Sequence, residues 1–354
     1  MTVIDRRRRS RGKFGVGVSL GEVALRANVS TASVSRVLNK SANVSEEVRQ
    51  RVELACQELG YVPNGVARAL AANKTMTIGA IVPAIENAGI AAAVAAFQRT
   101  LKHAGYTMLL TSSNYDEEAE FQEARTLLSR GVDGLMLVGG DHHPDLISLI
   151  THHQVPYIET WTLTAGRPCV GLDNVGAART LTDYLVSLGH ERIALIMGRI
   201  AGNDRAGLRV RGVRECLAHH GLPPPEEYLI GRPYNIPDIR EAMQSLLAKS
   251  ARPTALICGN DQIAFGSMIE ASKQGLDVPA DISIAGFNDL EFAAHLNPPL
   301  TTIRVPTEGI GRISAELLLK SVEDKSFIPD AVEIPATLVT RGSTAAPPIC
   351  IPCI

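Results

Sequence analysis

The sequence lacks the features of several large protein classes. No stretch of about 18 consecutive apolar residues is present, which argues against a membrane-spanning helix. No hydrophobic run follows the arginines at positions 6–9, so a secretory signal is not expected. The six cysteines are scattered without a disulfide framework, which favours a reducing cytoplasm over export. With 45% hydrophobic and 20% charged residues, we expect a cytoplasmic protein of ordinary globular composition.

The motifs of common enzyme classes are also missing. There is no Gly-x-Ser-x-Gly, Walker or His-Glu-x-x-His pattern, and the glycine-rich turns do not form a dinucleotide-binding fingerprint. Cys350 and Cys353 have the spacing of a metal or redox pair, but no second pair exists, so a flexible tail over 343–354 is favoured over a zinc site. The histidine pairs that begin at 142, 152 and 219 are expected to be solvated. We therefore expect no catalytic residue, no cofactor and no metal.

The net charge of −2 hides an uneven division of charge along the chain. Residues 1–74 hold 13 lysines and arginines against 6 acidic residues, so the rest of the chain carries a net charge of −9. A small basic unit joined to a large acidic one suggests that only the first meets a polyanion. Six of the positive charges lie at positions 6–13, so a basic flexible tail over 1–17 accounts for much of the excess.

Residues 18–62 carry the signals of three short helices. Ser19 and Glu22 form a capping box at the start of the first helix. Asn28 suits the end of that helix, because asparagine tolerates the left-handed backbone conformation that a sharp turn needs. Ser30 then begins a second helix, and a third follows. Two short helices joined by a three-residue turn are a helix-turn-helix, so we expect an all-α DNA-binding domain over 18–62.

The second of these helices leaves one polar face outside the core. Small hydroxylated residues at its start allow close approach to phosphates and base edges. Arg36 has the two-pronged guanidinium suited to guanine O6 and N7. The alternative is a plain three-helix bundle with a solvated polar face. The residues left uncommitted to the core are Thr31, Ala32, Ser33, Ser35, Arg36 and Asn39.

The segment Val18 to Asn39 resembles the headpiece of the lactose-repressor/galactose-repressor family of bacterial transcription regulators, as does Val44 to Asn64. The resemblance rests on the specific pattern Val-Ser-x-x-[Ser/Thr]-Val-Ser-Arg-Val-[Leu/Ile]-Asn. It implies that Thr31, Ala32 and Arg36 read bases. It also implies a set of residues that position the DNA backbone, namely Ser30, Ser33, Ser35, Asn39, Tyr61 and Asn64.

A connecting segment rich in alanine, residues 63–75, follows the headpiece. A helix this short with Gly65 inside it is marginal in water, so we expect the segment to be loose when free and helical when docked on DNA. A simple interdomain linker is the alternative. By the resemblance, Leu70 wedges into the minor groove of the operator, where it unstacks a base step and bends the duplex. Arg68 adds a phosphate contact.

Residues 76–342 alternate apolar β-like runs with amphipathic helices, which predicts parallel sheets with helices on both faces. This length is too great for one comfortable sheet, so we expect an α/β core of two lobes with a cleft between them. The core is similar to periplasmic sugar-binding proteins, which implies three strands crossing between the lobes. The two lobes are predicted to comprise approximately 76–174 with 306–325, and 175–300 with 328–342.

The same resemblance places a small-molecule effector between the lobes. Two places depart from the family pattern: Gly89 and Ile90 stand where members carry aromatics, and Asn288 stands where members usually carry aspartate. With Arg209 gripping the ligand, the loss of a carboxylate favours an anion, and we hypothesise a sugar acid or related small carboxylate. For each polar residue the alternative is loop capping or strand-end hydrogen bonding. The predicted effector-binding residues are Asn87, Ile90, Asp173, Arg209, Tyr234, Asn260 and Asn288.

These features predict a ligand-responsive, sequence-specific transcriptional regulator of carbohydrate or sugar-acid metabolism, acting as a repressor at the nucleoid. A single head contacts few bases, so we expect a homodimer on a near-palindromic operator of double-stranded DNA. A coupling of about 1–3 kcal/mol between effector and operator suffices for the response. The alternative is a cytoplasmic small-molecule-binding α/β protein or enzyme with an accessory helical head. An enzyme is opposed by the lack of a base–nucleophile pair in the cleft motifs.

Overall fold

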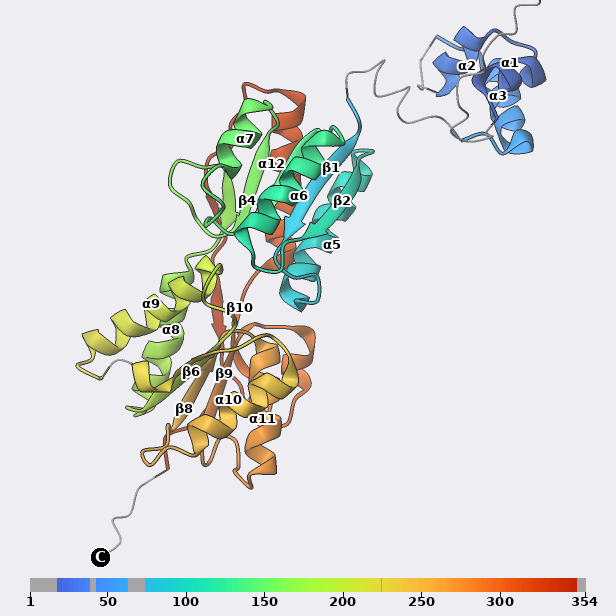
Figure 1. Ribbon diagram of the computed structural model, residues 1–354. Helices are drawn as coiled ribbons and strands as arrows, with labels where there is room; N and C mark the ends of the chain where they lie inside the picture. The colour runs from blue at the N-terminus through green and yellow to red at the C-terminus, as the bar shows by residue number, and fades with distance from the viewer. Residues whose placement is uncertain (1–17, 39–42, 63–73, 224, 349–354) are drawn as a thin grey trace, which may run out of the picture. The chain divides into compact units, whose positions relative to one another are not determined.

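The computed structural model describes residues 18–38, 43–62, 74–223 and 225–348 (Figure 1). The chain divides into a small N-terminal unit, residues 1–75, and a large unit, residues 76–354. The predicted basic tail and most of the predicted hinge lie outside the described residues, and so do four predicted DNA contacts: Asn39, Asn64, Arg68 and Leu70. No helix in the described part of the chain is long and apolar enough to span a membrane.

The N-terminal unit is the predicted three-helix domain. The capping box is present, since Glu22 N donates to Ser19 Oγ at 3.2 Å and Ser19 N donates to Glu22 Oε2 at 2.7 Å. Asn28 ends the first helix in the left-handed conformation, with φ 51°. Val23, Val34 and Val52, one from each helix, are fully buried against one another. The helices are α1 (Leu20–Ala27), α2 (Thr31–Leu38) and α3 (Glu46–Leu59).

The first lobe of the large unit is built on a parallel six-stranded sheet in the order β11-β5-β4-β3-β1-β2. Its central strands are continuous apolar runs, as expected where helices cover both faces. The strands are β1 (Thr77–Val82), β2 (Thr107–Ser112), β3 (Gly134–Val138), β4 (Tyr157–Trp161), β5 (Cys169–Gly171) and β11 (Val332–Glu333). The helices are α5 (Ala88–His103), α6 (Glu117–Ser129), α7 (Leu146–His152) and α12 (Thr307–Glu323).

The second lobe has a six-stranded sheet in the order β12-β10-β9-β8-β6-β7, parallel except for β12 against β10. Its strands are β6 (Ile193–Met197), β7 (Leu229–Gly231), β8 (Ala255–Cys258), β9 (Ser283–Asn288), β10 (Thr301–Arg304) and β12 (Thr337–Val339). Its helices are α8 (Asn174–Ser187), α9 (Asp204–His219), α10 (Ile236–Leu247) and α11 (Asp261–Lys273), with 3-10 turns η1 (Glu226–Tyr228) and η2 (Glu291–His295).

The chain crosses between the two sheets three times, as the resemblance implies. It leaves the first sheet after β5, returns after β10 through α12, which packs on α5, and leaves again after β11 (Figure 1). The predicted fold class, a helical head and a two-lobed α/β core with parallel sheets, is confirmed.

Two predicted boundaries differ from the structure. The sequence predicts residues 328–342 in the second lobe, but β11 pairs with β5 in the first sheet. The third crossing comes after this edge strand, so of these residues β12 is the strand that joins the second sheet. Residues 343–348 are not a flexible tail. Ser343 is fully buried, and it accepts hydrogen bonds from Thr301 N at 2.9 Å and from Ile284 N at 2.8 Å, so the chain here is bound to the starts of β10 and β9. Residues 349–354, with Cys350 and Cys353, lie outside the described residues.

Gly311 allows α12 to approach the backbone of α5 closely. A Cβ atom added at Gly311 would lie 2.0 Å from the carbonyl oxygen of Ala93, which is backbone and cannot rotate away. We therefore expect Gly311→Ala to lower the free energy of unfolding by about 1–3 kcal/mol or more, measured by chemical denaturation. Gly309→Ala in the same helix is the control, because its Cβ would meet only ordinary contacts beyond 3.5 Å. Equal stability of the two variants would contradict this close packing.

His142 lies in a buried charge cluster just after β3. Its side chain is 2% exposed, with Nδ1 2.9 Å from a carboxylate oxygen of Glu120 and Nε2 3.6 Å from one of Glu159. Arg167 Nη1 bonds Glu159 at 3.0 Å. The expectation that His142 is solvated is therefore wrong, because carboxylates distant in sequence hold the ring inside the lobe. His152, in contrast, is exposed as expected.

This cluster predicts a pH-dependent stability. Burial by itself lowers the pKa of His142, but hydrogen bonds and charges from Glu120 and Glu159 outweigh it and raise the pKa to about 9. The pKa of His142 in the folded protein exceeds its unfolded value of about 6.5, so protonation of the ring stabilises the fold. This stabilisation is complete below pH 6.5 and is lost as the pH rises through 9. We expect the free energy of unfolding to fall by on the order of 2–3 kcal/mol across this window.

Urea denaturation between pH 6 and pH 9.5 measures the effect. His142→Gln should flatten the dependence on pH, whereas the exposed control His152→Gln should retain it. The same slope in the wild-type protein and in His142→Gln would show that the buried imidazole does not titrate in this range.

Candidate functional site

The predicted polar face of α2 is exposed in the structure. Val34 and Val37 point into the core, while Thr31, Ala32 and Arg36 are exposed. No hydrogen bond or ion pair to the guanidinium of Arg36 is found among the described residues, so its donors are free for a ligand. An exposed fork at this position can reach base edges in a major groove.

The hydroxyl groups at the start of α2 have partners within the helix. Ser30 caps it: Ser33 N donates to Ser30 Oγ at 3.1 Å, and the two hydroxyls lie 3.0 Å apart. Ser35 and Tyr61 are half-buried, and Tyr61 packs against the three-helix core. Ser30 and Ser33 therefore stabilise the start of the helix whose exposed face carries Thr31, Ala32 and Arg36.

A second candidate site is a pocket between the two lobes of the large unit. It receives six of the seven predicted effector-binding residues. The first lobe supplies Asn87, Ile90, Tyr115 and Trp161, and the second supplies Met197, Gly198, Asn203, Arg205, Ala206, Arg209, Tyr234, Gly259, Asn260 and Asn288. Because the lining comes from both lobes, a bound molecule would contact both at once.

Asp173 is the predicted residue that does not line this pocket. It is exposed and caps α8, where Oδ1 accepts a hydrogen bond from Gly176 N at 2.9 Å. Its neighbour Asn174 is buried, and Asn174 Oδ1 accepts from Arg209 Nε at 3.0 Å. Because α8 begins at Asn174, Asp173 is its N-cap, and the amide of Asn174 faces the arginine instead.

Arg209 is held rigidly in the pocket wall. Its Nη1 donates to the carbonyl oxygen of Gly259 at 2.7 Å, and the guanidinium lies 3.7 Å from the centre of the Phe287 ring. No protein acceptor for Nη2 is found among the described residues. Burial lowers the pKa of Arg209 to about 10, so the side chain remains positively charged at neutral pH. The pocket therefore contains a fixed cation with an unused donor.

The asparagines of the pocket have two roles: two of them cap helices, and the other two present side-chain oxygens to the pocket. Asn260 Oδ1 accepts from Ile263 N at 2.8 Å, and Asn87 Oδ1 accepts from Gly89 N at 3.1 Å, so both cap helices. The predicted alternative of loop capping is thus correct for these two oxygens. In contrast, Oδ1 of Asn203 and Oδ1 of Asn288 are buried and have no hydrogen-bond partner among the residues that the structure describes. Two unpaired buried acceptors in one pocket are suited to a ligand that carries hydroxyl groups.

Tyr115, Trp161, Asn203 and Arg205 line the pocket but were not predicted. Tyr115 stacks on Tyr234 from the other lobe with ring centroids 6.0 Å apart. Trp161 is the only tryptophan and lies at the carboxyl end of β4. Its position at a strand end, where ligands bind in parallel sheets, is a signal that could have identified it.

A single carboxylate joins the two lobes beside the pocket. Asp204, the first residue of α9, accepts hydrogen bonds at Oδ2 from Gly140 N at 2.7 Å and from Thr162 Oγ1 at 2.8 Å. Both donors belong to the first lobe. Its other oxygen pairs with Arg205 Nη1 at 2.6 Å. The lobes are therefore connected in the arrangement in which the pocket is formed.

Comparison with known proteins matches both units. Residues 19–64 match the model of bacterial regulatory proteins of the lacI family, and residues 182–344 match the periplasmic binding protein-like domain. The HTH-type transcriptional repressor PurR of Erwinia tasmaniensis is 33% identical over 334 residues, which cover 93% of this chain and 98% of that protein. The ribose operon repressor of Escherichia coli is 33% identical over 328 residues, covering 92% and 99%.

A solved structure shows the same architecture. The lac repressor dimer bound to operator and an anti-inducer superposes with a TM-score of 0.83 at 29% identity, covering 93% of this chain and 100% of that one. The fold and the two sites define a bacterial transcription regulator with a DNA-binding headpiece and a two-lobed ligand-sensing core. The chain belongs to the lacI family of bacterial regulatory proteins. The resemblance seen in the sequence is confirmed.

Proposed function

We propose that this regulator is a dimeric repressor that binds a near-palindromic operator in the cytoplasm and responds to a sugar acid held between its lobes. The headpiece supports DNA binding through the exposed face of α2, with Thr31, Ala32 and Arg36 at the base edges. The relatives named above are repressors, which supports the same role here. Ser30, Ser33, Ser35, Asn39, Tyr61 and Asn64 position the DNA backbone in this proposal, with Arg68 and Leu70 contributing from the hinge.

The observation that carries the effector class is the charge of the pocket. Among its lining residues there are two arginines and no aspartate or glutamate. Arg205 is paired with Asp204, whereas Arg209 feels the charge of Asp204 without an ion pair to it, and no ion pair of Arg209 is found within the described ranges. A buried charge without a counter-charge is costly, and an anionic ligand removes that cost by supplying one. We infer that a carboxylate of the effector binds the free donor of Arg209.

The rest of the lining suits a hydroxylated carbon chain. The unpaired oxygens of Asn203 and Asn288 accept hydrogen bonds from hydroxyl groups. Trp161 offers an apolar ring face against which carbon atoms pack. Asn87, Ile90, Tyr234 and Asn260 complete the proposed binding set. A molecule with one carboxylate and several hydroxyls fits these groups, whereas a neutral sugar leaves the charge of Arg209 unpaired.

We further propose that the protein catalyses no reaction. The described residues lining the pocket include no serine, threonine, cysteine, histidine, lysine, aspartate or glutamate. The usual pairs of nucleophile and general base therefore have no members at this site.

Calorimetric titration with matched ligands tests the effector class. Aldonic and uronic acids are compared with the neutral sugars of the same carbon skeleton, such as gluconate with glucose and galacturonate with galactose. A thermal-shift screen selects the acids, since a ligand at about 100 times its dissociation constant stabilises by about 2.7 kcal/mol. We expect tight binding of an acid and weak binding of its neutral partner. Tight binding of a neutral hexose with no acid bound would reject the proposal.

A further inference from the structure

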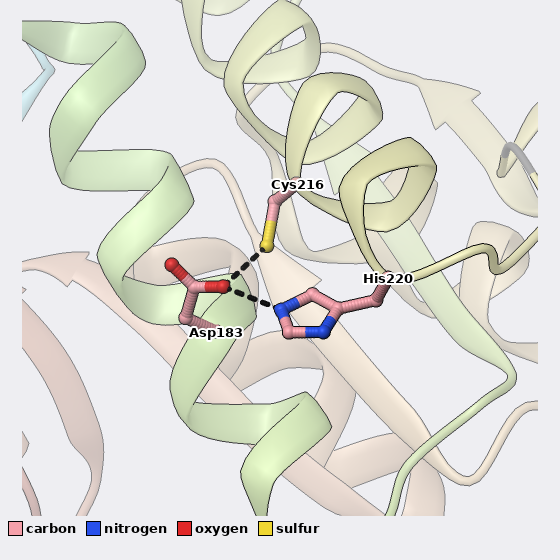
Figure 2. Close-up of side chains that lie close together, drawn as sticks. All are labelled: Asp183, Cys216 and His220. Carbon is pink, nitrogen blue, oxygen red and sulfur yellow. Dashed lines mark hydrogen bonds and ion pairs between the residues drawn. The ribbon is translucent and has the colours of Figure 1, made fainter.

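A cluster of three side chains joins the carboxyl-terminal ends of α8 and α9, which pack against each other in the second lobe. Asp183 comes from α8, Cys216 from the last turn of α9, and His220 follows that helix as its C-cap (Figure 2). Cys216 and His220 are four residues apart, so they lie on the same helix face and both point towards α8. The cluster therefore brings a thiol, an imidazole and a carboxylate to one point.

The ligand atoms of the cluster converge on one carboxylate oxygen. Asp183 Oδ1 lies 3.0 Å from Cys216 Sγ and 2.8 Å from His220 Nε2. All three ligand atoms lie within 4.8 Å of one another. Cys216 is 1% exposed, whereas the side chains of Asp183 and His220 are 54% and 37% exposed. The cluster is closed on the side of the thiol and open to solvent on the other.

The arrangement is unsuited to nucleophilic catalysis. The thiol of Cys216 donates its hydrogen bond to Asp183, and no hydrogen bond from it to an imidazole is found in the described part of the chain, so no base is placed to activate it. Burial and the neighbouring carboxylate raise the pKa of Cys216 to about 12. A thiolate therefore does not form at neutral pH unless a cation replaces the proton.

We propose that Asp183, Cys216 and His220 bind a zinc ion, with water as the fourth ligand. Zinc accepts a mixed set of sulfur, nitrogen and oxygen donors, whereas calcium and magnesium prefer oxygen alone. Zinc bonds of about 2.0–2.3 Å place tetrahedral donors about 3.3–3.6 Å apart. The distances from Asp183 Oδ1 to Cys216 Sγ and to His220 Nε2 each need to lengthen by about 0.5 Å, while Sγ and Nε2, which lie within 4.8 Å of each other, need to come to about 3.6 Å. The exposed side chains of Asp183 and His220 are free to make this adjustment.

Binding exchanges protons for the metal. The thiol of Cys216 loses its proton to water, and sulfur takes the zinc in its place. The neutral ring of His220 carries its proton on Nδ1 so that the Nε2 lone pair binds the ion, and the carboxylate of Asp183 binds in its ionised form. One proton is released for each zinc bound to the neutral form, so affinity increases with pH.

Arg179 opposes the cation. It precedes Asp183 by one helical turn on α8, and its positive charge lowers the pKa of both Asp183 and Cys216. His219 is a further titratable neighbour, with its ring centroid 5.4 Å from that of His220. Removal of the arginine charge should therefore strengthen zinc binding, which is the opposite of the effect of removing a ligand.

The zinc site is separate from the effector pocket. Arg209 and His220 are eleven residues apart, which corresponds to about 16 Å along a helix. The sequence did not reveal the cluster, because Asp183 lies 33 residues before Cys216 and only the packing of α8 on α9 brings them together.

Titration of the reduced, metal-free, full-length protein with Co²⁺ and then Zn²⁺ tests the proposal. We expect one Co²⁺ per chain with a thiolate-to-cobalt charge-transfer band in the near ultraviolet, displaced by Zn²⁺. Cys216→Ser should abolish the band, and His220→Gln should weaken Zn²⁺ binding by at least about 10–100-fold. Arg179→Gln should strengthen binding. His219→Gln is the matched control and should bind like the wild-type protein.

A double variant separates this site from the cysteines near the carboxyl end. Cys350→Ser combined with Cys353→Ser should leave the band and the stoichiometry unchanged. Loss of the band in that double variant, its persistence in Cys216→Ser, or absence of binding in the wild-type protein would each overturn the proposal. His220→Gln and Asp183→Asn alter exposed side chains and keep the test valid if Cys216→Ser does not fold.

Discussion

Arg209→Ala is expected to abolish the response to effector while the protein still binds its operator. The side chain supplies the only cation of the described pocket lining that lacks a carboxylate partner. Truncating one member of a buried, hydrogen-bonded charge pair costs about 2–5 kcal/mol, so effector affinity should fall by at least about 30-fold. The headpiece is a separate unit with its own core, so DNA binding does not require this arginine.

The measurement combines calorimetry of effector binding with operator retardation in the same protein. Arg211→Ala is the matched control, because this residue of the same helix is exposed and its ion pair is with the neighbouring Glu215, at 3.5 Å. The control should behave like the wild-type protein. Arg209→Lys retains the charge but not the planar fork, and we expect it to recover only part of the affinity. Normal effector binding by Arg209→Ala would refute the assignment of the anion site.

Arg36→Ala is expected to weaken operator binding by about 1–3 kcal/mol and to relax sequence preference. The guanidinium is exposed on α2 with no partner among the described residues, so its removal leaves the three-helix core intact. A contact to base edges contributes mainly to discrimination, whereas a phosphate contact weakens all sequences alike. The two kinds of contact are therefore distinguishable in one experiment.

Fluorescence anisotropy on the operator and on a scrambled duplex at fixed salt makes this comparison. The ratio of the two affinities should fall in Arg36→Ala and in Arg36→Lys, since a lysine lacks the fork that reads guanine. Gln50→Ala on the exposed face of α3 serves as the control. An equal loss on both duplexes would show that Arg36 contacts phosphate rather than bases.

Local signals in the sequence predicted the elements and their ends well. The capping box of Ser19 and Glu22 and the left-handed Asn28 depend on residues only a few positions apart, so the sequence contains the whole interaction. The same is true of the continuous apolar runs of the central strands. The strand–helix alternation and the helical head follow from these signals, and both are present in the structure.

Contacts between distant segments were predicted less well. The cluster around His142 depends on Glu120 and Glu159, which different elements supply. The edge pairing of β11 and the burial of Ser343 follow from how the chain crosses between the sheets. None of these contacts has a periodic or local signature, so sequence patterns alone could not reveal them.

In the pocket, some lining residues were predicted from the sequence and others were not. Six of the residues taken from the resemblance line the pocket, and two of them, Asn260 and Asn288, lie at the ends of β8 and β9. The resemblance did not predict Tyr115 and Arg205. These two side chains can be identified as part of the pocket only when both lobes are seen together. The residue that contacts Arg209 is one position after the predicted Asp173. The carboxylate of Asp173 caps α8, and the buried residue that faces Arg209 is Asn174.

In an effector-responsive repressor, occupation of the pocket changes DNA binding, and operator affinity measured with and without effector tests this most directly. Anisotropy titrations of the full-length protein use a labelled operator and the sugar acid that gives the largest rise in Tm. Coupling of about 1–3 kcal/mol predicts a 5–150-fold change in operator affinity, absent in Arg209→Ala. An acid that binds the pocket by calorimetry but leaves operator affinity unaltered would contradict the account.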